Sequence, residues 1–258
     1  MPFFKSFSIR IIGYLPYIIF FYVIYTIEIF RELLLYNGLL QLLLFLIVAC
    51  IPAYLTKRMS YVDIAWPWGL VLIGALVLLL GDGYKPRIFL ISGMYLFSGL
   101  RMGIGALILF KKGHLDSELS RYTYQRRRWE KAGYKNLDIS LQYEIMIQCF
   151  ANITFLALPA ILMAQNTATS ISVIEIIGAS LWAVWFVLEH VSDMQKQQFL
   201  KKSFLEKKKK QVCNAGFWKY SRHPNYFSEW MVWNSMILSA FFSFTTFYSQ
   251  DNLFVWGS

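Results

Sequence analysis

The sequence is poor in charged residues, cysteine and histidine. Only 16% of its 258 residues are Asp, Glu, Lys or Arg, and there are three cysteines and three histidines. Cys50, Cys149 and Cys213 lack metal-like spacing, so we expect free thiols and no disulfide framework. His114 and His190 have no second ligand or catalytic partner at a suitable spacing. We therefore expect no metal site.

Apolar residues are abundant instead. They make up 57% of the chain, 18% of the residues are aromatic, and the mean hydropathy is +0.45. These values are typical of a membrane protein rather than a soluble core of this size. The formal charge of +10 could indicate nucleic acid. The basic residues lie between long apolar runs, however, so we expect a lipid bilayer as partner and no nucleic acid.

Seven apolar runs are predicted to be membrane helices, at about residues 11–30, 39–56, 64–80, 88–110, 143–164, 172–191 and 228–249. With the N-terminus in the cytoplasm, the inside segments contain 21 Lys and Arg residues and the outside loops three. This asymmetry is what the positive-inside rule predicts. The expected fold is an all-α polytopic bundle, one domain over residues 1–258, in a bacterial inner membrane.

The densest collection of binding groups is the stretch from Gly216 to Trp230. Pro224 suits the first turn of a helix, so Arg222 and His223 are expected just before a helix N-terminus, where anions are stabilised. Asn225, Tyr226, Glu229 and Trp233 follow at helical spacing. We expect a cofactor pocket here, at a membrane face.

Charges beside apolar runs are costly and therefore suggest function. Asp63 opens the third run and is either a group that acts on substrate or a first-turn acid that complements the helix dipole. The glycines around Arg101, in Gly99-Leu-Arg-Met-Gly-Ile-Gly105, match no nucleotide-binding fingerprint. They favour close helix packing.

Two further stretches combine charge with aromatic residues. Residues 118–129 (Glu-Leu-Ser-Arg-Tyr-Thr-Tyr-Gln-Arg-Arg-Arg-Trp) could bind phosphates and rings. Alternatively, Arg126–Arg128 belong to a basic helix lying on the membrane. In residues 189–199, Asp193 and Lys196 either hold a ribose and a phosphate or form a surface ion pair worth only tenths of a kcal/mol.

Together these residues resemble a family. Asp193-Met-Gln-Lys196 and Phe199, followed by Gly216-Phe-Trp-Lys-Tyr-Ser-Arg-His-Pro-Asn-Tyr-Phe227 and Glu229, are similar to the C-terminal half of steroid 5α-reductase-type membrane proteins. The match is closest to their bacterial branch, DUF1295. Val62-Asp63 with Trp66 and Gly69, and Glu118 with Arg121-Tyr122, resemble earlier motifs of that branch. The resemblance covers about residues 60–235.

The resemblance implies a membrane reductase that binds NADPH from the cytoplasm and acts on CH–CH groups. Hydride would pass to a polarised C=C bond of an apolar steroid-, prenoid- or enoyl-lipid-like substrate. It assigns Asp63 and Tyr122 to catalysis. The residues that it assigns to the cofactor are Arg121, Asp193, Lys196, Arg222, His223, Asn225, Tyr226 and Glu229.

The sequence departs from the family pattern at two points, and two other functions remain open. A family glycine is replaced by Ser228, and relatives continue past residue 258 with another helix and a polar tail. Membrane methyltransferases of the isoprenylcysteine and phospholipid type, which use S-adenosylmethionine, share the Arg222-His-Pro-x-Tyr226 theme. This chain lacks their downstream acidic pair. A non-catalytic or truncated lipid-binding protein is the third interpretation.

Overall fold

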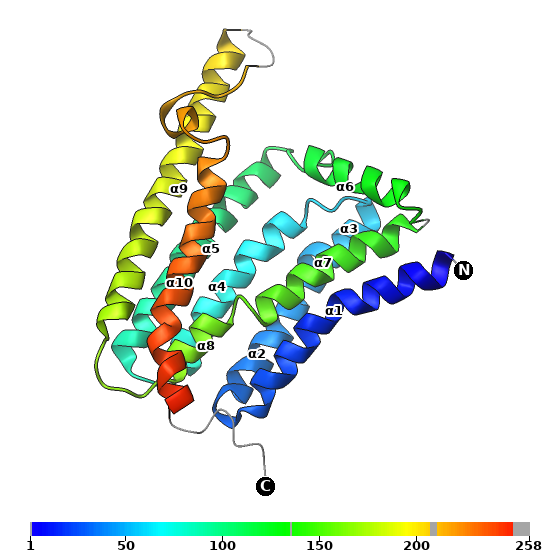
Figure 1. The fold of residues 1–258 in the computed structure, drawn as a ribbon. Coiled ribbons are helices and arrows are strands. Elements are labelled where there is room, and N and C mark those ends of the chain that lie inside the picture. Colours follow the sequence, from blue (N-terminus) through cyan, green and yellow to red (C-terminus); the bar gives the residue numbers. More distant parts are fainter. Residues whose placement is uncertain (1, 135, 207–210, 250–258) are drawn as a thin grey trace. The chain divides into compact units, whose positions relative to one another are not determined.

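The computed structural model describes residues 2–134, 136–206 and 211–249, with side chains from residue 12 to residue 248. Every regular element in these ranges is a helix, which confirms the all-α prediction (Figure 1). The chain divides into two compact units. Unit 1 comprises residues 1–169 and 247–258, and unit 2 comprises Ser170–Thr246. The single domain over residues 1–258 stays a prediction.

Unit 1 is built from α1 to α8. The elements are α1 (Pro2–Thr26), α2 (Glu28–Phe45), the π-helical turn η1 (Leu46–Cys50), α3 (Ile51–Thr56), α4 (Val62–Leu80), α5 (Lys85–Lys111), α6 (Ser120–Lys131), α7 (Leu137–Ile153) and α8 (Leu158–Gln165). Because α2, η1 and α3 follow without a break, they form one helical segment, and Pro52 lies in it without ending it.

Five helical segments are long and apolar enough to cross a bilayer: Glu28–Thr56, Val62–Leu80, Lys85–Lys111, Leu137–Gln165 and Val173–Leu205. The protein is therefore a multi-pass membrane protein. Residues 12–26 form a shorter apolar helix. The count of seven spans and the inward N-terminus stay predictions.

The predicted boundary between the first two spans is wrong. The structure ends α1 at Thr26, and α2 begins at Glu28 after the single extended residue Ile27. The predicted loop around Arg31 is helical because Leu33 and its neighbours in α2 pack in the core. Arg31 itself donates to the carbonyl of Tyr25 at 3.2 Å, which satisfies a backbone acceptor near the end of α1.

The fifth predicted span starts earlier than expected and is interrupted. Between α7 and α8 the chain leaves the helical conformation at Thr154, five residues before Pro159. Within a membrane the freed carbonyls need partners. The buried Asn37 amide donates to the carbonyls of Asn152 and Ile153, both at 3.2 Å. A side chain of α2 thereby stabilises the broken helix.

Helices α4 and α5 pack very closely. A Cβ atom on Gly99 would lie 2.8 Å from the carbonyl oxygen of Pro67, and one on Gly103 would lie 3.0 Å from the Trp68 indole nitrogen. The packing role predicted for these two glycines is confirmed. Gly105 has open space instead, so the same prediction is wrong at that position. This close packing against α5 holds α4 in position, and α4 carries Asp63 in its first turn.

Unit 2 contains α9 (Val173–Leu205), the short 3-10 helix η2 (Gly216–Lys219) and α10 (Pro224–Ser249) up to Thr246. A capping box of Ser172 and Glu175 begins α9. Pro224 opens α10, as predicted. With 33 residues, α9 is about 50 Å long, whereas the apolar core of a bilayer is about 30 Å thick. The polar C-terminal part of α9 therefore reaches beyond that core.

Candidate functional site

The first cluster lies where α4 begins. Tyr122 donates its hydroxyl to Asp63 Oδ1, and Arg121 Nη2 pairs with Asp63 Oδ2. Both donors come from the first turn of α6, nearly sixty residues further along the chain. The Arg121 guanidinium also lies 4.9 Å from the centre of the Tyr122 ring. One carboxylate thus holds a cation and a phenol together.

These contacts set the protonation states of the two α6 residues. Burial and the neighbouring Asp63 carboxylate raise the pKa of Tyr122 above its usual range. Partial burial opposes the charge of Arg121, but the attraction of Asp63 outweighs it and raises the pKa of the guanidinium. At neutral pH the cluster therefore presents a protonated phenol and a guanidinium cation.

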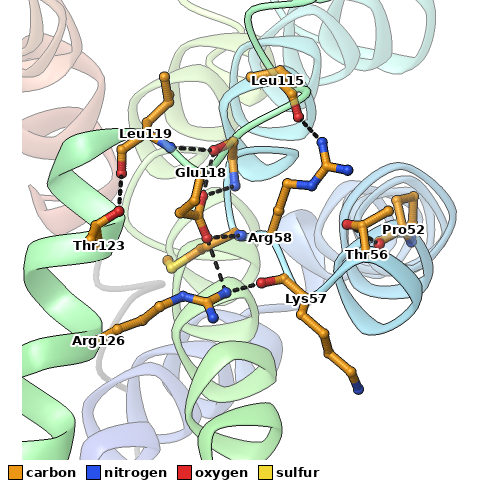
Figure 2. A network of polar contacts seen from close by, with 11 residues as sticks. Pro52, Thr56, Lys57, Arg58, Leu115, Glu118, Leu119, Thr123 and Arg126 are labelled. Atoms are coloured by element: carbon orange, nitrogen blue, oxygen red, sulfur yellow. Dashed lines mark hydrogen bonds and ion pairs between the residues drawn. The ribbon is translucent and has the colours of Figure 1, made fainter.

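A second set of contacts holds α6 against the start of α4, and we call it the Glu118 clasp (Figure 2). Glu118 accepts hydrogen bonds from the backbone N–H groups of Met59 and Ser60, at 2.8 and 3.2 Å, and from the Ser60 hydroxyl. Arg126 reaches the same carboxylate at 3.1 Å and also donates to the carbonyl of Lys57. The clasp fixes the turn that precedes Asp63.

The Glu118 clasp gives Glu118 and Arg126 structural roles that the sequence did not predict. Glu118 was expected only as part of a family motif, and Arg126 as part of a basic surface helix. Arg126 is only 23% exposed and faces Glu118, so the surface interpretation is wrong for it. Arg127 and Arg128 are exposed, as that interpretation expects. Glu118 lies before the first residue of α6, so helical spacing could not have linked it to Arg126.

The second cluster lies in unit 2, on α9 and the start of α10. Asn225 donates its side-chain amide to Asp193 Oδ1 at 3.0 Å. The other amide atom, Asn225 Oδ1, is buried, and no hydrogen-bond partner for it is found within the described residues. A buried acceptor without a partner is unfavourable, so a ligand that donates a hydrogen bond would complete it.

The segment before α10 is fastened to the same turn of α9. Trp218 donates its indole N–H to the carbonyl of Ser192 at 2.9 Å, and Lys196 Nζ lies 4.7 Å from the Trp218 ring centre. Gly216 has a φ of +56°, and a Cβ atom there would lie 2.3 Å from the Gln195 amide. A side chain at position 216 would therefore strain the backbone and push aside the Gln195 amide, which accepts a hydrogen bond from the Phe217 N–H.

The remaining predicted residues surround this junction. Arg222 and His223 are exposed and directly precede α10, as expected. The His223 ring stacks on Tyr226, with ring centres 5.3 Å apart. Glu229 is half-buried one turn after Asn225. The stretch therefore combines cationic, aromatic and amide groups at a helix N-terminus.

The structure brings the predicted residues together as two clusters. Asp63, Arg121 and Tyr122 meet in unit 1, and Asp193 and Asn225 meet in unit 2. Within the described ranges, no group of three or more His, Cys, Asp or Glu side chains is placed to hold a metal ion.

Comparison with known proteins identifies the family. The model of DUF1295, described as a protein of unknown function, matches residues 45–255. The match extends beyond the resemblance expected at residues 60–235 and contains all ten predicted site residues. No curated protein and no solved structure matches the chain. The match covers most of the sequence, so the chain belongs to the DUF1295 family, part of the steroid 5-alpha-reductase-like group.

Proposed function

We propose that the protein is a membrane-embedded reductase that uses NADPH to reduce a polarised C=C bond of an apolar, lipid-like substrate. The cluster of Asp63, Arg121 and Tyr122 carries this proposal. When hydride adds to a C=C bond conjugated with a carbonyl, negative charge develops on the carbonyl oxygen. A neutral phenol and a guanidinium, held ready beside each other, are suited to stabilise that charge.

Each member of the cluster has a distinct role in this proposal. Tyr122 keeps its proton and donates to the substrate oxygen, which takes the place of Asp63 as the acceptor. Asp63 orients the Tyr122 hydroxyl and keeps Arg121 nearby. Arg121 is 56% exposed at its side chain, so it remains accessible to a ligand phosphate or to the substrate carbonyl. The Glu118 clasp preserves the geometry of all three.

The residues of unit 2 fit a dinucleotide. NADPH would supply the hydride, and its phosphates need cations and helix N-termini. Lys196 and Arg222 offer cations, and α10 offers its N-terminus next to His223. The unpartnered Asn225 Oδ1 suits an amide donor such as the nicotinamide carboxamide. Asp193, Tyr226 and Glu229 complete the proposed cofactor set.

The proposed orientation follows from charge and length. The basic segments, including those that carry Arg121 and Lys196, are assigned to the cytoplasmic side by the excess of Lys and Arg. The polar end of α9 extends past the apolar core, and α6 is rich in charged residues. NADPH would then bind from the cytoplasm and the substrate would arrive from the bilayer, which we propose is a bacterial inner membrane.

A ligand titration tests the proposal against its rivals. Purified protein in detergent is titrated with NADPH and, separately, with S-adenosylmethionine, and its thermal stability is followed. At 100 times its dissociation constant, a ligand specific for the folded state stabilises it by about 2.7 kcal/mol. We expect this effect from NADPH. Stabilisation by S-adenosylmethionine alone would indicate a methyltransferase, and no response to either would favour a lipid-binding protein.

The variants Asn225→Ala and Lys196→Ala are expected to weaken NADPH binding by at least about tenfold each, because each removes one polar contact to the cofactor. Asn234→Ala and Lys201→Ala are matched controls, since both residues are exposed and lie outside the proposed site on the same two helices. If the site variants bind NADPH as tightly as the controls, the proposed cofactor site is wrong.

A further inference from the structure

Unit 1 has a second site, separate from the Asp63 cluster. An apolar groove with a volume of about 590 Å³ runs between the Glu28–Thr56 segment and helices α4 and α5. The residues that line it include Val48, Tyr61, Ile64, Trp68, Leu107 and Phe110. Its volume lies within the roughly 300–1,000 Å³ of small-molecule sites. The lining contains no carboxylate, histidine or cation, so it offers a place to bind rather than to react.

The groove and Asp63 are on different faces of α4. The lining residues of α4 are Ile64, Trp68, Val71 and Leu72, which share one helical face with Tyr61, the residue just before the helix. At about 100° per residue, Asp63 lies about 130° away from the centre of that face. Asp63 is instead directed to Arg121 and Tyr122. A molecule in the groove would therefore not contact the proposed catalytic cluster.

One end of the groove is apolar and the other is basic. Tyr61 and Phe110 mark the basic end, with ring centres 6.5 Å apart. Lys111 is exposed and follows Leu107 by four residues, so it lies one helical turn beyond a lining residue on the same face of α5. Lys57 and Arg58 lie in the turn just before Tyr61, but Lys57 pairs with Asp138 and Arg58 donates to the carbonyl of Leu115, so the basic end is assigned to Lys111. An apolar groove with a cationic mouth complements an amphiphile with an anionic head.

We propose that this groove binds an acyl chain of an anionic phospholipid, with the phosphate headgroup at Lys111. The lining runs along the membrane-spanning α4 from Ile64 to Leu72 and meets the end of α5 at Leu107 and Phe110, which places the acyl chain in the bilayer. Lys111 then lies at the depth of the headgroups, where a basic residue attracts anionic lipid. This site is independent of the proposed reductase activity.

Trp68 lines the groove and can report its occupant, because bromine atoms on an acyl chain quench a nearby indole. The full-length protein is placed in bilayers that contain an increasing fraction of brominated phosphatidylglycerol or, over the same range, of brominated phosphatidylcholine. The chain has nine tryptophans, so the Trp68 contribution is the difference between the wild-type protein and Trp68→Phe. We expect this contribution to be quenched at an about fivefold lower fraction of the anionic lipid.

Lys111→Glu is expected to remove that preference. Arg127→Glu is the matched control, because it makes the same charge change at an exposed position of α6 outside the groove and should leave the preference intact. Equal quenching by the two lipids would overturn the anionic site. Trp68 fluorescence that neither lipid quenches would show that protein, such as a second copy of the chain, covers the groove, and would also overturn the proposal.

Discussion

Replacing Tyr122 by phenylalanine is expected to slow the proposed reduction by roughly 10²–10³-fold, the usual contribution of one positioned hydrogen-bond donor to a developing oxyanion. The substitution keeps the ring, which packs in the core and against Arg121, and removes only the hydroxyl that contacts Asp63. The rate is measured as NADPH oxidation that depends on added membrane lipid extract. NADPH binding, followed by thermal stability, should be unchanged, so the loss should appear in kcat.

Tyr124→Phe is the matched control for this prediction. It lies on the same helix, but its side chain is 65% exposed, and the rate should stay within twofold of wild type, roughly the variation of a neutral surface change. The raised pKa of Tyr122 adds a second check. Because the phenol keeps its proton where an ordinary tyrosine ionises, near pH 10, the rate should not fall through its ionisation between pH 7 and about 10. Equal rates for Tyr122→Phe and Tyr124→Phe would exclude Tyr122 as the donor.

Replacing Glu118 by alanine is expected to lower the free energy of unfolding by about 2–4 kcal/mol. The Glu118 and Arg126 side chains are only 14% and 23% exposed, so the substitution leaves the Arg126 charge and two backbone N–H groups without their acceptor. Unfolding is measured by denaturant titration in mixed micelles. Glu118→Gln retains one acceptor oxygen and should lose less stability than Glu118→Ala.

The pair of Lys57 and Asp138 provides the control for the Glu118 clasp. Its nitrogen and oxygen lie 2.8 Å apart, but both side chains are about half exposed. Such exposed pairs contribute at most about 1 kcal/mol, so Asp138→Ala should have a small effect. If Glu118→Ala and Asp138→Ala cost the same, the clasp does not hold α6 against the start of α4.

Most helices of the fold could be predicted, because membrane-spanning segments are recognisable in the sequence by their length and hydropathy. Pro224 marks the start of α10, and the Asp193 and Asn225 motifs, 32 residues apart, do meet. The break after Ile153 was missed, because what stabilises it is Asn37, a residue on α2. The helical start of α2 was also missed. The polar residues around Leu33 indicate a loop, but the packing of Leu33 in the core favours a helix.

The first cluster shows what a single sequence leaves open. Asp63 and Arg121 were each recognisable as candidates, but their direct pairing depends on where α6 lies. That position is set by the contact of Glu118, which precedes α6, with Arg126 on α6. Charged residues on a short amphipathic helix have the same pattern whether they face lipid headgroups or a turn of the protein. Only the fold distinguishes Arg126 from Arg127.

The proposed reductase activity is tested most directly by following the hydride. The protein is incubated with a membrane lipid extract and NADPH carrying deuterium at C4 of the nicotinamide ring, using both stereochemical forms of the label. Mass spectrometry then compares the lipids with those treated with Tyr122→Phe. We predict one lipid class that gains one deuterium and one proton from solvent, with little gain in the variant. If no lipid gains deuterium from either form, or if lipids instead gain a methyl group from labelled S-adenosylmethionine, the protein is not the reductase proposed.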